Sequence, residues 1–397
     1  MVGLIFYGLP LFYTEFIREF GWSRRQLTAP YAFSVLVLAP VIGLLMGTLI
    51  ERFGIRRVMF VGVLCAAIAL IGFSRMHSLA AWFVLYFVST IGYMLAGPIP
   101  NQVLISQWFR RMRGRVMGMA YLGIGIGGAL VPQLVKHGMA ELGWRQTLLI
   151  GGVVVAVLLA PVILFVIRQR PQDVGQHPDG DPAPAAAAPP APAITLREVV
   201  RRRAFLLLAA GSFFSIAAIG SVIQHLKLYL VGQKFTDAQA ADVLSVLLIA
   251  SIAGRVIMGF LADRFSNKPV MVAAYFMVGA SIPLLYFVHV PNMIYVFAAV
   301  FGFGMGADYM MIPLMAAECF GANSLGRVMG FILPTDSIGQ AIFPWVVGWL
   351  FDLTGSYSIG FAVMTAAGLL GVIAIAMIQP RAESARLAEA QTVRASS

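Results

Sequence analysis

Charge is scarce in this sequence. Aspartate, glutamate, lysine and arginine together make up 11% of the 397 residues, whereas 60% are hydrophobic. A soluble domain has about a quarter charged residues, so this composition argues against a surface that faces mainly water. Apolar runs recur along the chain at roughly the 20-residue length that a helix needs to cross a hydrocarbon core of ~30 Å. We therefore expect an all-α polytopic membrane protein.

Cysteine is almost absent, since the chain has only Cys65 and Cys319, both inside apolar runs. This placement indicates no disulfide, and no Cys/His cluster points to a metal site. The chain has no Walker-type phosphate loop, and the glycine-rich stretch at 123–128 lies inside an expected span. No span pairs a nucleophile with a histidine base or carries an aspartate dyad. We expect neither an enzyme nor a bound cofactor or metal.

The net charge of +11 does not indicate a nucleic-acid partner here, because the basic residues lie in short loops between apolar runs. The loops expected on one face, with the C-terminal tail, hold 19 of the 28 Lys and Arg residues, and those on the other face hold eight. Only Arg255 lies inside a span. The positive-inside rule then places both termini and the central linker in the cytoplasm.

The apolar runs predict twelve membrane-spanning helices. The first six are expected near 1–17, 27–50, 57–74, 80–106, 113–136 and 146–168. The second six are expected near 204–231, 240–262, 268–289, 292–318, 326–350 and 357–379. Only about 14 apolar or neutral residues precede Glu15, which is short for a span. We expect the first helix to be truncated, with roughly ten to twenty further residues in the native chain.

The sequence nearly repeats itself at an offset of 212 residues. The matched positions are Gly47–Phe53 with Gly259–Phe265, Gly114–Gly118 with Gly326–Gly330, Pro132 with Pro344, and Gly143 with Gly355. Four separated matches in one register indicate two copies of one half, an architecture that many secondary transporters use to place a binding site between repeats.

The repeat divides the chain into two bundles and two cytoplasmic segments. The expected parts are an N-terminal six-helix bundle (1–168), a linker (169–203), a C-terminal six-helix bundle (204–379) and a tail (380–397). The linker contains an Ala/Pro tract, and proline removes helix hydrogen bonds, so we expect a flexible, extended segment there.

The stretch from Gly47 to Arg57, G-x-L-x-E-R-F-G-x-R-R, resembles the signature loop between helices 2 and 3 of the major facilitator superfamily. A degenerate second copy stands at Gly259–Lys268. The resemblance covers nearly the whole chain. It implies the major facilitator fold, two six-helix bundles that alternate access to a midplane site.

A narrower resemblance is to the monocarboxylate transporter and oxalate–formate antiporter branch. It rests on Trp108–Gly114 before a glycine-rich fifth helix, on Gly21–Arg24, and on Gly254-Arg255 before Gly259–Arg264. In that family the arginine of helix 8 binds the substrate carboxylate, which implies this role for Arg255. The chain departs from the family in two places, which are considered next.

Animal monocarboxylate carriers accompany that arginine with an aspartate, and Ser251 stands near the matching position. The oxalate-type lysine of helix 11 would fall at or near Asp336. A dianion site with two cations is therefore not expected. The first-helix motif of the family falls where this sequence begins, so it offers no comparison.

Charges inside a membrane are costly and require a partner or a task. Arg255 lies about 12 Å along its helix from Asp263, and Asp336 lies about 13–14 Å from Arg327, at a rise of about 1.5 Å per residue. We expect Arg255 to bind a carboxylate and Asp336 to titrate a proton that is coupled to it. The alternative is a permanent Arg255–Asp336 pair that only holds helices together.

Other polar residues inside the spans have two open interpretations each. Asp308, in a glycine-rich stretch, either couples protons or has a structural role. Gln340 lies four residues beyond Asp336 on one helix face, while Asn101 and Gln102 follow a proline-bent segment. We expect these three amides to line the substrate cavity, with packing as the alternative. His225 is a further proton-accepting candidate or an interfacial hydrogen-bond partner.

The two signature loops predict charge networks at the cytoplasmic face that stabilise one state of the transporter and do not contact substrate. Their residues are Gly47, Glu51, Arg52, Arg56, Arg57, Gly259, Asp263 and Arg264. The arginines between 110 and 115 are interpreted as topology determinants close to anionic lipid headgroups.

These features predict a secondary active transporter for a small organic anion, with a single embedded arginine favouring a monocarboxylate and protons as the coupling ion. An efflux carrier for a drug-like or other metabolite is the first alternative, and a membrane sensor without turnover is the second. We expect a multi-pass protein of the plasma (inner) membrane that functions as a monomer.

Overall fold

The computed structural model describes residues 8–181 and 196–380. Every regular element in these ranges is a helix, and none of the described residues lies in a strand. The all-α membrane class predicted from composition is confirmed. Part of the first expected helix (residues 1–7), the Ala/Pro tract of the linker and most of the tail lie outside the described residues.

The described residues of the first half form seven α-helices. They are α1 (Tyr13–Phe20), α2 (Arg24–Phe33), α3 (Ala39–Phe53), α4 (Ile55–Ser74), α5 (Leu79–Ala96), α6 (Pro98–Trp108) and α7 (Arg113–Pro161). Shorter 3₁₀ or π segments are η2 (Leu9–Phe12), η3 (Ser34–Leu38) and η4 (Val162–Val166). Because η3 joins α2 to α3 without a break in the helical backbone, residues 24–53 form one long element.

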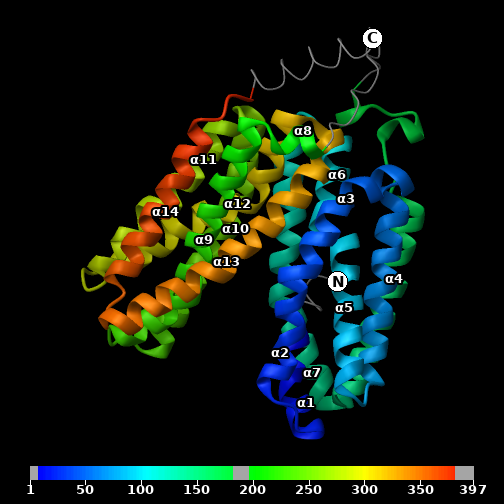
Figure 1. The fold of residues 1–397 in the computed structure, drawn as a ribbon, viewed down its shortest axis with the longest axis horizontal. Coiled ribbons are helices and arrows are strands. Elements are labelled where there is room, and N and C mark those ends of the chain that lie inside the picture. Colours follow the sequence, from blue (N-terminus) through cyan, green and yellow to red (C-terminus); the bar gives the residue numbers. More distant parts are fainter. Residues whose placement is uncertain (1–7, 182–195, 381–397) are drawn as a thin grey trace. The chain divides into compact units, whose positions relative to one another are not determined.

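The linker region contains two short 3₁₀ turns, η5 (Pro171–Val174) and η6 (Pro178–Gly180), and the one-turn helix α8 (Leu196–Val200). Residues 203–380 of the second half form six longer α-helices and two 3₁₀ segments (Figure 1). They are α9 (Arg203–Gly232), α10 (Asp237–Arg264), α11 (Asn267–Ser281), η7 (Ile282–Phe287), α12 (Met293–Phe320), η8 (Ala322–Ser324), α13 (Leu325–Thr354) and α14 (Ser358–Ala376).

Glycine and proline set the internal breaks of the longer elements. Gly97 separates α5 from α6, where Pro98 and Pro100 remove backbone donors that a continuous helix would need. Gly143 has a φ of 76° inside α7, a conformation that favours glycine, so this element consists of two helices that meet at a bend. Those two parts correspond to the expected spans 113–136 and 146–168.

Nine stretches of the described residues are long and apolar enough to cross a membrane. One of them, Arg113–Val166, contains two of the expected spans. The expected span 326–350 lies within α13, which is helical over 30 residues but is not one of the nine. The helices of the structure thus account for the twelve expected positions, the first only in part.

Two units divide the chain. Unit 1 contains residues 1–108, 122–187 and 329–334, and unit 2 contains 109–121, 188–328 and 335–397. Each unit therefore takes one short segment from the other half of the sequence. The segment 109–121 and the segment 329–334 stand at corresponding places in the 212-residue repeat, so the exchange is itself nearly symmetric.

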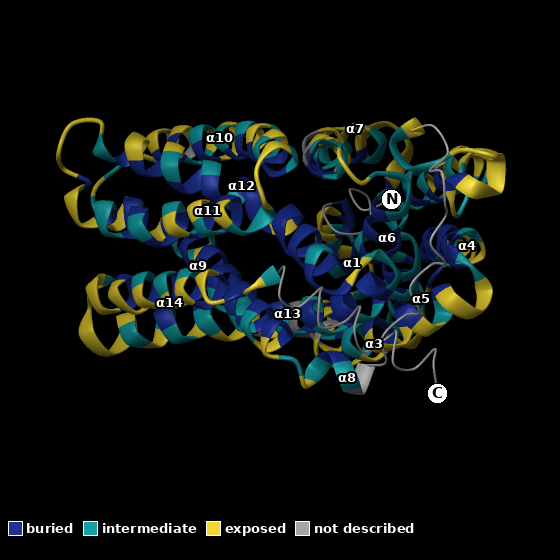
Figure 2. Ribbon diagram, turned by 90° about the horizontal axis from the view of Figure 1, so that it is seen from above, coloured by how far each residue is buried: buried dark blue, intermediate teal, exposed yellow. Residues whose placement is uncertain are grey.

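The interior of unit 2 forms around α12. This helix contacts α9, α10 and α11, and it is buried along most of its length (Figure 2). Phe297 and Phe301 are fully buried and lie against each other with ring centroids 5.2 Å apart. A helix covered on nearly all sides needs no polar face for solvent. Asp308, in the middle of α12, is therefore placed among protein atoms.

Candidate functional site

Glycines bring α10 and α12 into close contact. A Cβ at Gly302 would lie 2.2 Å from the Leu247 carbonyl oxygen, and one at Gly306 would lie 2.1 Å from that of Ser251. From the other side, a Cβ at Gly254 would lie 2.0 Å from the Phe303 carbonyl oxygen. The sequence prediction that the glycines of this stretch permit close helix approach is confirmed. The contact fixes Arg255, the next residue after Gly254, beside α12.

Arg255 is half-buried on α10. Its backbone carbonyl oxygen faces α7, because a Cβ at Gly118 would lie 2.7 Å from it. The segment of α7 that makes this contact belongs to the same unit as Arg255. The arginine is thus held on a helix that packs closely on both α7 and α12.

The same contact recurs at the repeat offset. Gly43 is the residue that corresponds to Arg255, and Gly330 corresponds to Gly118. A Cβ at Gly43 would lie 2.6 Å from the Gly330 carbonyl oxygen, and this contact lies within unit 1. The two halves therefore share a backbone contact, but only the second copy carries a charged side chain there.

Two buried carboxylates lie next to α9. Ser212 donates a hydrogen bond of 2.8 Å to Oδ1 of Asp336 on α13, and Ser215 donates one of 3.1 Å to Oδ1 of Asp308 on α12. Asp308 is 1% exposed and Asp336 is 2% exposed. The two serines stand one helical turn apart, so the same face of α9 serves both acids.

Tyr275 of α11 completes this group. Its side chain is fully buried and lies close enough to Asp308 and Asp336 for their charges to act on its hydroxyl. The hydroxyl makes no hydrogen bond of ordinary geometry, and the Oδ2 atoms of both aspartates have none either. Four helices of one unit therefore converge on a buried polar cluster made of Ser212, Ser215, Tyr275, Asp308 and Asp336.

Asp336 accepts a hydrogen bond from Ser212 of α9, a neighbour that the sequence did not single out. The two roles that the sequence leaves open for Arg255 and Asp336, a coupled substrate and proton site or a permanent ion pair, both stay predictions.

The three predicted cavity amides have different surroundings. The side-chain nitrogen of Asn101 donates to the carbonyl oxygens of Ala96 and Gly97, at 3.1 and 2.7 Å. These carbonyls lose their helical partners at the Pro98–Pro100 break, so Asn101 stabilises the bend. Gln102 is 1% exposed. Gln340 is half-buried on α13 and packs against α9, where a Cβ at Gly220 would lie 2.9 Å from its Cγ.

Asp263 caps the start of α7. Its Oδ1 accepts a hydrogen bond of 2.6 Å from the Gly114 backbone N–H, and its Oδ2 accepts bonds from the backbone N–H and Nε of Arg115, at 3.0 and 2.9 Å. A carboxylate is favoured at this position because the first N–H groups of a helix lack partners and carry partial positive charge. A Cβ at Gly114 would lie 2.4 Å from the Gly259 carbonyl oxygen, so the helix start also touches α10 directly.

The first signature loop makes contacts of another kind. The Arg56 guanidinium donates to the Leu164 carbonyl oxygen, and the Ile55 backbone N–H donates to Gln169 Oε1 at 3.3 Å. The Arg52 guanidinium lies over the Phe53 ring at 5.4 Å. Glu51, Arg57 and Arg264 are exposed. The loop thus ties α4 to the segment after α7, and its substrate-gating role stays a prediction.

A pocket with a volume of about 680 Å³ lies at the other end of unit 2. His225 lies at its wall, where Nε2 contacts the Pro344 carbonyl oxygen at 2.9 Å and Nδ1 contacts the Tyr357 hydroxyl at 3.3 Å. Because a carbonyl oxygen only accepts, Nε2 carries a hydrogen in this contact. Neither Arg255 nor Gln340 lines this pocket, so it differs from the predicted substrate site.

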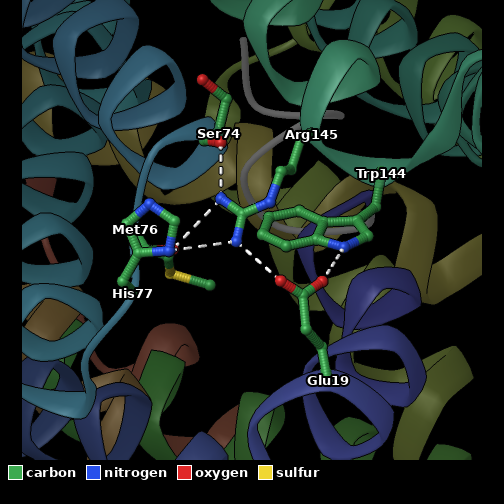
Figure 3. Close-up of polar contacts among 6 residues, drawn as sticks. All are labelled: Glu19, Ser74, Met76, His77, Trp144 and Arg145. Carbon is green, nitrogen blue, oxygen red and sulfur yellow. Dashed lines mark hydrogen bonds and ion pairs between the residues drawn. The ribbon is translucent and has the colours of Figure 1, made fainter.

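Unit 1 holds a polar cluster that links α1, the end of α4 and α7 (Figure 3). Arg145 Nη2 donates to Glu19 Oε1 at 2.7 Å, and Trp144 Nε1 donates to Glu19 Oε2 at 2.7 Å. Arg145 Nη1 also donates to the carbonyl oxygens of Ser74 and Met76, at 2.9 and 3.2 Å. The hydrogen bond from Arg145 lowers the pKa of the Glu19 carboxyl.

The family model that matches the sequence is that of the Major Facilitator Superfamily, over residues 1–241 and 226–396. Together these matches span almost the whole chain. The chain belongs to the major facilitator superfamily. The sequence predicted this family, and it predicted a transporter rather than an enzyme; both predictions are confirmed.

Curated relatives within the superfamily include carboxylate carriers. Monocarboxylate transporter 12 of Mus musculus is 26% identical over 306 residues, covering 70% of this chain and 63% of that protein. The 3-(3-hydroxy-phenyl)propionate transporter of Escherichia coli K12 is 25% identical over 362 residues, covering 89% of this chain and 84% of that one. The chain thus spans less than two thirds of the mouse carrier's length.

Solved structures of the superfamily share the fold. The fucose:proton symporter of E. coli aligns with a TM-score of 0.68 at 14% identity, covering 88% of this chain and 92% of that one. The human organic anion transporter MFSD10 aligns with a TM-score of 0.67 at 14% identity, covering 88% and 83%. At these identities the likeness supports the major facilitator fold alone.

Sequence reasoning missed several partners of the site residues in this superfamily member. Arg115 was assigned to lipid headgroups, whereas it pairs with Asp263. Ser212, Ser215 and Tyr275 were not singled out, although the three-residue spacing of the two serines on an apolar helix is a signal for one shared face. None of the described residues forms a group of three or more His, Cys, Asp or Glu side chains able to hold a metal.

Proposed function

We propose that this protein is a secondary active transporter that moves a small organic anion, a monocarboxylate, by alternating access with proton coupling. The observation that carries the proposal is Arg255. It is a half-buried arginine inside a span, on a helix packed closely against α7 and α12. A charge at that depth is costly unless it has a task. The two curated relatives described above, both carboxylate carriers by name, favour the same substrate class.

Arg255 supplies the substrate-binding cation in this proposal. The planar guanidinium fits a carboxylate with two parallel hydrogen bonds, which a lysine ammonium does not match. Gln340, half-buried on α13 of the same unit, supplies a neutral polar contact for the remainder of the substrate. The apolar surroundings suit an aliphatic or aromatic tail, and one cation suits one carboxylate.

Asp336 and Asp308 supply the proton-coupling groups. Both are buried in unit 2 and accept hydrogen bonds from serine hydroxyls of α9. A buried carboxylate strongly favours its neutral form unless a cation or several donors stabilise the charge. A change of protonation at these residues therefore alters the balance between the two states of the carrier.

The helix contact at Asp263 acts as a conformational latch in the cycle. Its carboxylate stabilises one state through the α7 N-terminus and Arg115. We place this latch, both termini and the linker on the cytoplasmic side of a plasma membrane, following the distribution of basic residues. The proposed carrier works as a monomer.

The experiment that tests the substrate class is exchange of labelled acids across proteoliposomes at equal pH on both sides. The panel extends from lactate and pyruvate through aromatic acids to oxalate, with wild type, Arg255→Ala and Arg255→Lys. Arg201→Ala, an exposed arginine outside the spans, is the control. We expect monocarboxylate exchange that falls at least tenfold in Arg255→Ala, is only partly kept in Arg255→Lys, and is unchanged in the control.

Exchange that is indifferent to Arg255 would contradict the proposed site. No exchange of any acid in the panel, together with transport of uncharged drug-like compounds, would favour an efflux carrier. Saturable binding without any exchange would favour a sensor.

A further inference from the structure

The buried polar cluster of unit 2 is short of one hydrogen-bond donor. Asp308 and Asp336 together present four carboxylate oxygens, of which the two Oδ1 atoms accept from Ser215 and Ser212. Both Oδ2 atoms are buried without a hydrogen-bond partner. The remaining donor beside them is the fully buried hydroxyl of Tyr275, which also has no partner. Three hydroxyls therefore face four acceptors.

The two carboxylates do not have equal surroundings. Asp308 has two hydroxyls beside it, those of Ser215 and Tyr275. Asp336 has only that of Ser212, and it feels the charge of Asp308. When Tyr275 donates to Asp308, the oxygen left without a donor is Oδ2 of Asp336.

The hydroxyls of Ser212 and Ser215 on α9 donate to the two carboxylates, and each acid keeps a buried Oδ2 without a hydrogen bond. Burying two negative charges side by side without a cation costs far more than burying one that accepts two hydrogen bonds. One bound proton removes the second negative charge and also supplies the missing hydrogen-bond donor.

We propose that Asp308 and Asp336 form one site for a single exchangeable proton, carried by Asp336, with Asp308 kept ionised by Ser215 and Tyr275. The inference rests on the proton coupling proposed above and assigns it to one two-carboxylate site. The three hydroxyls set which acid is protonated.

Release of the proton creates a second charge in the same interior. The two carboxylates then repel each other while α12 and α13 remain bound to the same face of α9 through Ser215 and Ser212. The arrangement gives proton release a direct mechanical effect on the packing of three helices. This is the property that a coupling site needs.

Infrared difference spectroscopy tests the site without any substrate. We expect the purified wild type at neutral pH to show the C=O band of a protonated carboxyl that disappears on alkaline titration. Asp336→Asn removes this band, whereas Ser221→Ala leaves it unchanged. Ser221 is a matched control, because it lies buried on α9, the helix of Ser212 and Ser215, but donates within that helix to the Ala217 carbonyl oxygen at 2.7 Å. A wild type without the band, or a band that persists in Asp336→Asn, would overturn the proposal.

Transport variants distinguish the two carboxylates. We expect Asp336→Asn to retain exchange at equal pH and to lose its response to a pH gradient. Asp308→Asn removes the neighbouring negative charge that favours the proton on Asp336, so the pH dependence of transport in this variant shifts to lower pH. Tyr275→Phe removes a hydrogen-bond donor to the ionised Asp308, so the pH dependence of transport in that variant shifts to higher pH. A shift of the same sign in both of the latter variants would contradict the assigned roles.

Sodium forms a separate arm of the experiment. Uptake driven by a sodium gradient at equal pH, and lost in Asp336→Asn, would overturn the proton assignment. The infrared result does not depend on which substrate is carried. If the acid panel is silent while the carboxyl band behaves as expected, the proposed substrate class fails and the proton site stands.

Discussion

Single residues decide the chemistry of this carrier, and most of their partners lie far away in sequence. Arg115 and Asp263 are separated by 148 residues, and Ser212 and Asp336 by 124. Local sequence patterns carry no information on such pairings, whereas they do show which residues are charged inside an apolar run. Arg255, Asp308 and Asp336 were therefore predicted as candidates, but Ser212, Ser215 and Tyr275 were not, since hydroxyls are common in apolar helices.

One residue-scale prediction concerns Glu19. Arg145 and Trp144 donate to its carboxylate, and the lowered pKa means that the folded state stabilises the ionised form. That contribution is present above the ordinary pKa of 4.5 and is lost as pH falls through the folded-state value. The group is largely exposed, so we expect Glu19→Gln to cost only about 0.5–1 kcal/mol at neutral pH.

Thermal unfolding of the purified protein between pH 7 and pH 4 measures this effect. The gap in melting temperature between wild type and Glu19→Gln should narrow toward the acid end. Glu141→Gln, at an exposed acid four residues before Arg145 in α7, is the control. A gap that widens on acidification would contradict the assigned ion pair.

A second residue-scale prediction concerns Asp263. Replacing it with alanine removes the cap of α7 and the ion pair with Arg115. Loss of a helix cap costs about 1 kcal/mol, and loss of the partly buried charge pair adds to this cost. We expect a lower melting temperature for Asp263→Ala and a smaller decrease for Asp263→Asn. Asp242→Ala, at an exposed acid of the same helix, should match the wild type.

At the scale of whole elements, glycine contacts explain how charged side chains are held at fixed positions. Sequence periodicity and apolar length predicted the helices of this fold, because crossing a membrane constrains both. The glycines of 302–306 were also interpreted correctly as sites of close approach. Which helix each glycine faces was not predictable, since a glycine carries no side chain to identify its neighbour.

The element-scale prediction is that the glycine positions at the contact of α10 and α12 tolerate no larger side chain. A Cβ at Gly306 would lie 2.1 Å from the Ser251 carbonyl oxygen, so Gly306→Val must push the two backbones apart. We expect a destabilisation of about 1–3 kcal/mol or loss of the folded protein, detected by size-exclusion chromatography after heating. Gly232→Val is the control, because nothing lies within 4 Å of its Cβ position. Equal stability of both variants would show that the contact is looser than described.

At the scale of the whole molecule, the two copies of one half-sequence have diverged in charge. The contact of Gly43 with Gly330 and that of Arg255 with Gly118 occupy corresponding positions. Embedded charge is concentrated in the second copy, which also carries Asp308 and Asp336. The repeat predicted the fold because symmetry constrains the backbone, and it did not predict the site because function requires the copies to differ.

The central claim is that this chain moves a carboxylate at the expense of a proton gradient. The measurement that tests it most directly is accumulation of a labelled monocarboxylate in proteoliposomes with the outside made acidic, in the presence and absence of a protonophore. The account predicts uptake above the equilibrium level that collapses with the protonophore and is absent in Arg255→Ala. Uptake that never exceeds the equilibrium level, or that is unchanged by the protonophore, would contradict proton-driven transport.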